Sequence, residues 1–218
     1  MTMLKAVLFD LDGTLLDTVP DIQECVNRTL AAYGYPAISY AQACAYIGDG
    51  ARKLVERAMP SDAPDVEQCY KAFRADFALC DNALTGLYPG EKETLCALKE
   101  RGIKLGIVTN KPHEATLRLV EQYFPAGTFD FVAGDSGEFA CKPDPSLARY
   151  AALTMRVSCA ECAFVGDGET DALVARNAGM LGISVLWGYR TRAQLEQAGA
   201  KRFVNSYQEL LSLLKKNF

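Results

Sequence analysis

The first apolar run of this sequence ends in two carboxylates, and that junction restricts the possible folds more than any other feature. Residues 6–9 are mostly apolar, and Asp10, Asp12 and Gly13 follow almost at once. Four residues are too few to span a membrane, but they fit one buried strand of a parallel sheet. Carboxylates at the end of such a strand are costly to bury unless a cation or protons compensate their charge. An ordinary Asp-Gly turn is the alternative interpretation.

Ligands of open α/β sheets bind at the carboxyl ends of the strands, where these two carboxylates are expected. We interpret Asp10 as a group that attacks an electrophile and Asp12 as a group that transfers a proton. A Mg²⁺ ion would lie between them and the substrate. The short motif alone leaves this interpretation open, and later segments of the chain decide it.

Composition and charge argue against several classes of protein. A chain of 218 residues, 50% hydrophobic and 23% charged, can bury a substantial core and is typical of a soluble globular protein. The net charge of −4 argues against electrostatic binding to nucleic acid. We expect no membrane partner, because no apolar run is long enough to cross a bilayer. A signal-peptide pattern is missing at the N-terminus, so we expect a cytoplasmic location.

Cysteine and histidine usage narrows the metal chemistry. Without an export signal, the eight cysteines are expected to be reduced thiols. Cys159 and Cys162 have the spacing of a metal or redox pair, but no second pair accompanies them, so we interpret them as incidental. The only histidine, His113, excludes a zinc site built from several histidines.

The second half of the chain alternates between apolar runs and helical patterns. Strands are predicted at residues 103–108, 129–133, 163–165 and 183–186. Helices are predicted at residues 91–101, 112–124, 145–155 and 206–216, and a further helix follows residues 166–168 and ends at residue 177. Such alternation is the signature of a parallel doubly wound sheet. We therefore predict an α/β fold with a Rossmann-like, doubly wound parallel sheet as its core.

A helical block interrupts this sheet early in the chain. Four helical patterns, and no convincing strand, lie between about residues 17 and 85, at residues 20–34, 41–47, 50–59 and 64–80. Pro20 suits the first turn of the first helix, with Thr18 as its candidate N-cap. The sequence thus predicts two domains: a sheet core of residues 1–16 and 86–218, and a helical insertion of residues 17–85.

Polar side chains follow the predicted strands. Thr109 and Asn110 end one strand, Asp167 and Asp171 follow another, and the long loop between them carries Lys142. Because parallel strands point the same way, these side chains should meet the first carboxylate pair at one edge of the sheet. Transfer of a phosphoryl group needs such a set, with carboxylates for a hard cation and a hydroxyl and an ammonium for phosphate oxygens.

Each of these residues also has an ordinary interpretation. Asn110 could cap the next helix with Glu114 nearby, Lys142 could be a solvated loop lysine, and residues 166–167 could be a plain turn. Their occurrence together, in this order, argues against coincidence.

The order and spacing resemble the haloacid dehalogenase-like superfamily along nearly the whole chain. Residues 10–14, Thr109, Lys142 and residues 166–171 match its four motifs in turn. Thr109, Asn110 and Lys142 are accordingly expected to bind phosphate.

The resemblance implies that Asp10 is a nucleophile that forms an aspartyl-phosphate, and that Asp12 acts as general acid and then as base. It implies that Mg²⁺ is held by Asp10, the backbone carbonyl of Asp12 and Asp167, with Asp171 in support. Residues 17–85 would form the helical cap of the family.

The acid at Asp12 favours phosphate esters, because dehalogenases lack it and an alkoxide leaving group needs a proton. Residues 47–50, 108–112 and 187–190 resemble the phosphoglycolate phosphatase subgroup. The resemblance implies a Mg²⁺-dependent phosphatase for a small phosphorylated metabolite; no oligomeric state is implied. A pyrophosphatase, a sugar-phosphate mutase and a non-catalytic binding protein on the same scaffold stay as alternatives.

The insertion offers one candidate for substrate recognition. Residues 48–50 read Gly-Asp-Gly and precede a helix that should begin near Ala51. Arg52 lies in its first turn, where a guanidinium could hold a carboxylate through two hydrogen bonds. A solvated arginine on a helix surface is the alternative.

Overall fold

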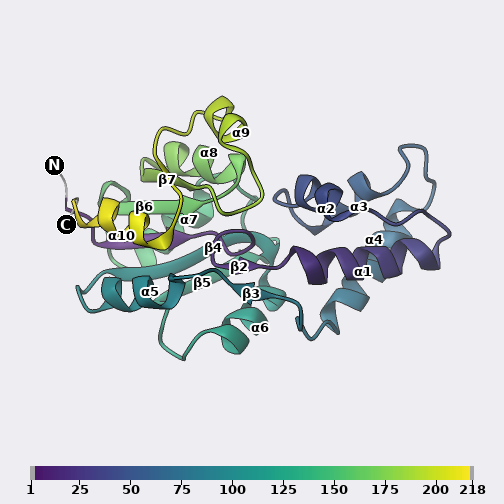
Figure 1. Cartoon of the computed structure of the whole chain (residues 1–218), viewed down its shortest axis with the longest axis horizontal. Helices are drawn as coiled ribbons and strands as arrows, with labels where there is room; N and C mark the ends of the chain where they lie inside the picture. Colours follow the sequence, from purple (N-terminus) through teal and green to yellow (C-terminus); the bar gives the residue numbers. More distant parts are fainter. Residues whose placement is uncertain (1–2, 217–218) are drawn as a thin grey trace.

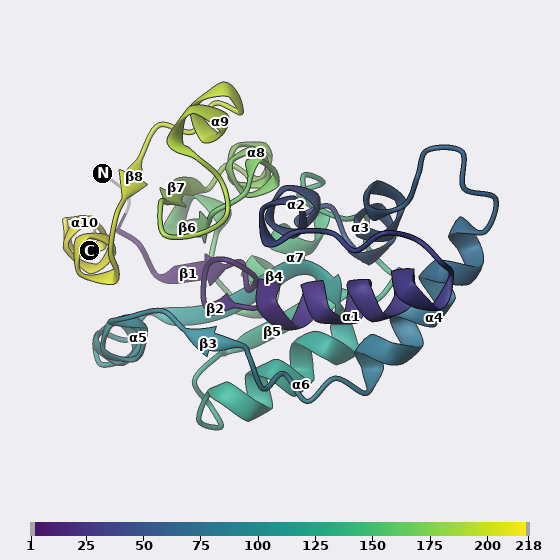
Figure 2. The same ribbon diagram turned by 45° about the vertical axis from the view of Figure 1, so that its right-hand side comes forward.

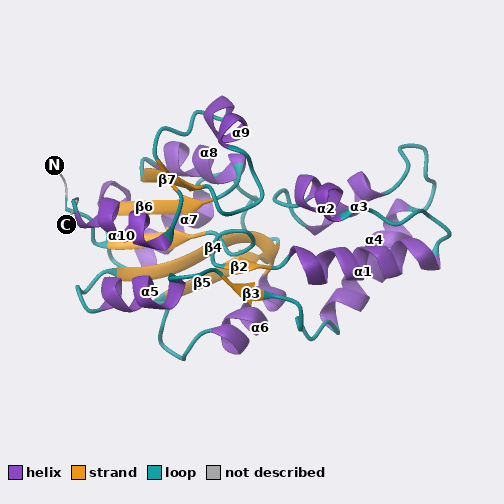
Figure 3. Ribbon diagram, in the orientation of Figure 1, coloured by secondary structure: helices purple, strands orange, loops and turns teal. Residues whose placement is uncertain are grey.

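The computed structural model describes residues 3–216, and its centre is a six-stranded parallel sheet in the order β5-β4-β1-β6-β7-β8 (Figures 1 and 3). The six strands are β5 Phe131–Asp135, β4 Lys104–Pro112, β1 Ala6–Phe9, β6 Cys162–Gly166, β7 Leu181–Val185 and β8 Phe203–Val204. With helices on both faces, this is the α/β, Rossmann-like doubly wound core that the sequence predicts.

The central strand β1 explains why both faces must be covered. All four of its residues are fully buried, and it pairs with β4 on one side and β6 on the other. Side chains alternate along a strand, so Val7 and Phe9 join one hydrophobic cluster while Ala6 and Leu8 join another. Burial of apolar surface stabilises a fold by about 25 cal/mol per Å², so a strand that is apolar on both faces is most stable in the middle of the sheet.

Each cluster belongs to a different layer of helices. The first draws on α5, α6 and α10, and the second on α7 and α8. These helices span α5 Glu91–Lys99, α6 His113–Tyr123, α7 Ser146–Thr154, α8 Glu169–Ala178 and α10 Tyr207–Lys215, and α9 is Arg192–Gln197. The short α9 and the two-residue β8 were not predicted, because elements of this length carry little periodicity.

Residues 17–85 contain four helices that lie beyond one end of the sheet (Figures 1 and 2). They are α1 Val19–Ala32, α2 Tyr40–Tyr46, α3 Ala51–Ala58 and α4 Val66–Ala78. Their apolar faces form a separate cluster, which α1 and α4 share through residues such as Val26, Leu30 and Phe73. Ala115 of α6 belongs to the same cluster, so the helical segment also packs against the sheet part.

The two crossings into and out of this segment lie side by side. Leu16–Asp17 (β2) pairs antiparallel with Gly86–Leu87 (β3), a ribbon too short for the sequence to indicate. Thr18 occupies the N-cap position of α1, as predicted, but its side chain makes no capping hydrogen bond and donates instead to Asp12 Oδ1 at 2.7 Å. Across residues 3–216, no helix combines the length and apolar character needed to cross a membrane.

Candidate active site

The carboxyl ends of β1, β4 and β6 open into a cavity between the sheet and the helical segment. Asp10 and Asp12 follow β1, and Asp167 follows β6. The far side is lined by apolar side chains of the helical segment, among them Leu54 and Phe77. The strands that follow β1 in the sequence are added first on one side of it, as β4 and β5, and then on the other side, as β6, β7 and β8. The cavity therefore lies at the topological switch point, where doubly wound folds bind ligands.

Three carboxylates from different segments converge here. One oxygen each from Asp10, Asp167 and Asp171 lies within 4.8 Å of the others, and all three residues are buried. Burial, followed by the charges of Asp171 and Asp10, raises the pKa of Asp167 to about 8. Burial and the charge of Asp10 raise the pKa of Asp171 to about 6, against the opposing effect of Lys142. The cluster thus holds more negative charge than its surroundings compensate.

Asp167 is held by its own neighbours and by two glycines. Its carboxylate accepts hydrogen bonds from Thr14 Oγ1 at 3.0 Å and from the backbone N–H of Tyr189 at 2.8 Å. A Cβ at Gly13 would lie 2.4 Å from one Asp167 oxygen, and a Cβ at Gly188 would lie 2.3 Å from its side chain. Gly13 also has φ +80°, which suits glycine. Only glycine at both positions leaves room for this carboxylate.

Lys142 is the cation of the cluster. Its Nζ lies 2.8 Å from Asp10 Oδ1 and 2.7 Å from Asp171 Oδ1, and the side chain is 2% exposed. Although burial alone would lower the pKa of Lys142, the two carboxylates raise it. Asn110 fixes the loop, because its Oδ1 accepts from the Lys142 N–H at 2.7 Å and its Nδ2 donates to the Lys142 carbonyl at 3.1 Å.

This donor set fits a divalent cation. The three carboxylates face one ammonium, and Asp10 Oδ1 makes no hydrogen bond of normal geometry although Lys142 lies close. One ammonium cannot balance three buried carboxylates, and a hard cation with oxygen ligands would compensate the remaining negative charge. The residues present therefore suit Mg²⁺ better than a soft metal.

Asp12 lies outside the carboxylate cluster and has different partners. Thr18 Oγ1 donates to its Oδ1, and Lys111 Nζ lies 3.0 and 3.3 Å from its two oxygens. Lys111 was not singled out from the sequence. It comes two residues after Thr109, a spacing that returns a strand side chain to the same face, and this signal could have identified it.

The strand β4 continues through Pro112, with a register shift between Val108 and Pro112. The alternative role of Asn110 as a helix cap is therefore wrong: it lies inside the strand, and Pro112 precedes α6. Thr109 is buried and lines the cavity, as expected of a phosphate contact. The side chain of Asn110 makes three hydrogen bonds, two with the backbone of Lys142 and one to the Gly48 carbonyl. Its contact with phosphate stays a prediction.

Arg52 is not one of the residues that line the cavity. Its guanidinium pairs with Glu56 at 3.2 Å and with Glu67 at 2.8 Å, and its side chain is 52% exposed. The neighbouring Gly50 and Ala51 do line the cavity, so the helix start is where the sequence placed it. Substrate binding by Arg52 stays a prediction, and its ordinary interpretation as a surface residue fits these contacts.

Arg190 is the guanidinium that does reach the cavity, and the sequence did not assign it a role. It donates to the carbonyls of Cys44 and Ile47 in the helical segment at 2.5 and 2.6 Å, and to Glu169 of α8 at 2.9 Å. Its side chain is 9% exposed. Arg190 therefore ties the sheet part to the loop before α3.

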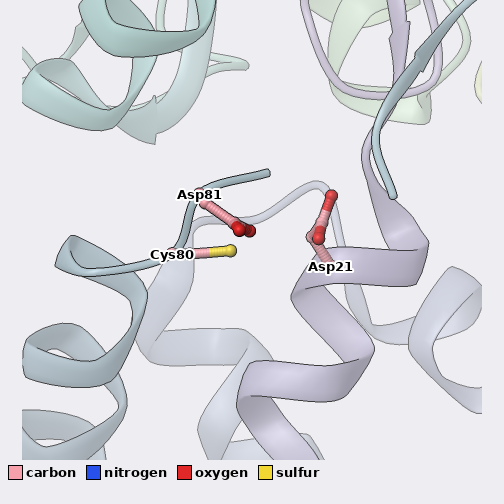
Figure 4. A group of neighbouring side chains, drawn as sticks. All are labelled: Asp21, Cys80 and Asp81. Carbon is pink, nitrogen blue, oxygen red and sulfur yellow. The ribbon is translucent and has the colours of Figure 1, made fainter. Parts of the chain in front are cut away.

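A second group within residues 3–216, Asp21, Cys80 and Asp81, has the composition of a metal site (Figure 4). Asp21 already accepts hydrogen bonds from the Leu84 N–H at 3.1 Å and from Thr85 Oγ1 at 2.6 Å. These bonds fasten the exit from α4 to the start of α1. We therefore interpret this group as structural, and all eight cysteines are free thiols as expected.

A family model named haloacid dehalogenase-like hydrolase matches residues 7–185. This chain belongs to that hydrolase family. A phosphoglycolate phosphatase of Vibrio parahaemolyticus is 33% identical over 97% of this chain and 96% of its own length. The plasmid-encoded phosphoglycolate phosphatase of Cupriavidus necator is 36% identical over 96% of this chain and 92% of its own length.

Solved structures agree with this family membership. A protein of Lactobacillus delbrueckii with a provisional phosphoglycolate phosphatase name has a TM-score of 0.91 and 29% identity, covering 98% of this chain and 99% of its own. CbbY of Rhodobacter sphaeroides, solved with phosphate, has a TM-score of 0.73 and 26% identity, covering 95% of this chain and 96% of its own. Within the haloacid dehalogenase-like hydrolases, this chain is a phosphatase-type enzyme, a phosphoric monoester hydrolase.

Proposed function

We propose that this hydrolase is a Mg²⁺-dependent phosphatase that cleaves a small phosphomonoester, of the phosphoglycolate kind, through an aspartyl-phosphate on Asp10. The observation that carries the proposal is the cluster of three buried carboxylates at the edge of the cavity, in which Asp10 lies 2.8 Å from the Lys142 ammonium. A carboxylate held this way is available to attack an electrophile. The curated relatives named phosphoglycolate phosphatase support the substrate class.

The reaction would run in two steps on residues of the sheet part. An oxygen of Asp10 attacks phosphorus, the bond from phosphorus to the ester oxygen breaks, and Asp12 donates a proton to the departing alkoxide. Asp12 then takes a proton from water, whose oxygen attacks the phosphorus of the aspartyl-phosphate. The bond from phosphorus to the Asp10 oxygen breaks, which releases inorganic phosphate and restores the Asp10 carboxylate. Thr109 and Lys142 would hold the phosphoryl oxygens during both steps.

Asp10, Asp167 and the backbone carbonyl of Asp12 would hold Mg²⁺, and Asp171 would support the set through Lys142. When bound, the ion would offset the negative charge of the phosphoryl group and of the carboxylates. Asp167 stays in place because Thr14 and Tyr189 donate to it.

The helical segment, residues 17–85, would act as a cap domain over this chemistry. Leu54 and Phe77 line the cavity opposite the carboxylates, and Arg190 reaches the cap loop from the sheet part. Closure of an apolar cover would exclude bulk water from the aspartyl-phosphate, and opening would release product.

The direct test is phosphate release from a panel of small phosphomonoesters. We expect turnover with Mg²⁺ and its loss in excess chelator, with phosphoglycolate among the better substrates. Inclusion of pyrophosphate and of a sugar phosphate with a bisphosphate activator separates the alternative activities. Absence of phosphate release from every ester, with folded protein and Mg²⁺ present, would contradict the proposal.

A further inference from the structure

We propose that Lys111 selects esters that carry a second anionic group next to the phosphate, such as a carboxylate on the adjacent carbon. This inference rests on the proposed function and assigns the recognition of the leaving group to one side chain. It concerns the part of the substrate that departs, whereas Thr109 and Lys142 serve the part that is transferred.

Lys111 is a buried ammonium that faces the cavity. Its Nζ contacts both oxygens of Asp12, at 3.0 and 3.3 Å, and its side chain is 3% exposed. The ring of Phe77, from α4 of the cap, lies 4.8 Å from the same Nζ. The ammonium is therefore enclosed between the residue expected to protonate the leaving group and an aromatic cover.

This position places Lys111 beside the leaving group rather than beside the phosphate. A proton donor must lie within hydrogen-bonding distance of the ester oxygen that it protonates, about 2.6–3.2 Å. Asp12 therefore locates that oxygen, and a carboxylate on the next carbon lies only two covalent bonds further. Since Lys111 already touches Asp12, such a carboxylate would come within reach of its ammonium.

The other cations near the cavity are committed elsewhere. Among the described residues that line the cavity, the cationic side chains are Lys111 and Arg190. Arg190 uses its guanidinium on two cap carbonyls and Glu169, and Arg52 pairs with two carboxylates at the surface. A substrate carboxylate would thus find Lys111 as its partner.

The cover makes this contact selective. Phe77 lies over the ammonium, and the Lys111 side chain is almost wholly buried. A contact between opposite charges is stronger in such surroundings than in water. A neutral leaving group would leave the ammonium with Asp12 alone and gain nothing from it. Discrimination therefore arises from the charge of the leaving group and not from its size.

The test compares two esters of similar size, phosphoglycolate and ethyl phosphate. We expect Lys111→Met to lower the ratio of their kcat/KM values by about tenfold or more, with most of the change in KM for phosphoglycolate. Lys111→Arg, which keeps the charge, should restore much of the preference. Lys53→Met, on the exposed surface of α3, is the matched control and should leave the ratio unchanged.

An unchanged ratio in Lys111→Met, with both esters slowed equally, would overturn the proposal and make Lys111 a support for Asp12. Binding provides a measurement that does not need turnover. In an Asp10→Asn background, calorimetry should show that Lys111→Met weakens phosphoglycolate at least tenfold more than ethyl phosphate, and equal weakening overturns the proposal. If the wild-type protein hydrolyses neither ester, the proposed function fails, while this binding ratio still decides the role of Lys111.

Discussion

The two sides of the cavity are built on different principles. On the sheet side, a buried ionic network joins Asp10 at the end of β1, Asp171 in α8 and Lys142 in the loop before α7. On the cap side, the lining is apolar, with side chains such as Phe73 and Phe77. Two arginines of similar chemistry show the contrast: Arg190 is buried at the junction, and Arg52 lies exposed on the cap. The chemical steps should therefore depend on the sheet side. Substrate choice and the exclusion of water should depend on the junction between the sheet part and the cap.

The largest effect should come from Asp10→Asn. An amide is a poor nucleophile and a weaker metal ligand, so we expect turnover to fall by about a thousandfold or more with the fold retained. Steady-state phosphate release measures the loss, and circular dichroism measures the fold. Activity above a few per cent, after mass spectrometry has excluded deamidation, would show that the sheet side does not work through this carboxylate.

Lys142→Met should produce the next largest effect and should alter stability as well. The variant leaves Asp10 and Asp171 buried without their cation, so the free energy of unfolding should drop by about 3–5 kcal/mol in chelator. Activity should fall by about a hundredfold, since a phosphate contact is lost. Lys99→Met, at a more exposed ion pair, is the control. Equal stability in the two variants would mean that the ionic network is not what organises this side.

Arg190→Met tests the junction between the two sides. It removes the two hydrogen bonds that join the sheet part to the cap, those to the carbonyls of Cys44 and Ile47, so kcat/KM should fall by about tenfold. Hydrogen exchange at residues 44–50 should become faster, while exchange in β1 stays unchanged. Arg192→Met, at an exposed pair with Glu196, is the control. Slower exchange, or the same exchange, in residues 44–50 would remove Arg190 from the account of the cap.

The smallest effect is expected for Arg52→Ala. Its partners, Glu56 and Glu67, are themselves exposed, and surface ion pairs of this kind contribute little. We expect KM for phosphoglycolate to change by less than about twofold. A rise of tenfold for an acidic ester, without a similar rise for a neutral aryl phosphate, would restore the sequence-based role of Arg52 in substrate binding.

The same contrast explains what the sequence revealed. Asp10, Asp167 and Lys142 follow strands or lie in the loop that reaches them, and the order of strands in a doubly wound sheet brings such residues together. The fold and this part of the site follow from local patterns. The spacing from Thr109 could have indicated that Lys111 faces the site, but no local pattern gives the partners of Lys111 or Arg190, because those partners lie on segments far away in the chain.

Arg52, whose role in substrate binding stays a prediction, shows how packing limits what spacing along a helix can indicate. A cation next to a glycine-rich helix start resembles an anion site, and Ala51 does line the cavity. The direction of the next side chain depends on packing against α4, where Glu67 and Tyr70 lie within reach of the guanidinium. Sequence spacing gives the position of a residue on a helix, but the neighbouring helix decides where its side chain finds a partner.

The central claim, a covalent phosphoryl group on Asp10, has one direct measurement. Asp12→Asn should still react with nitrophenyl phosphate, whose leaving group needs no proton, but it should hydrolyse the aspartyl-phosphate slowly. We predict a burst of about one nitrophenolate per protein, no matching burst of inorganic phosphate, and a phosphoryl group on the peptide that contains Asp10. Nitrophenolate and phosphate released together in equal amounts from the first turnover, with no phosphorylated peptide, would contradict the account.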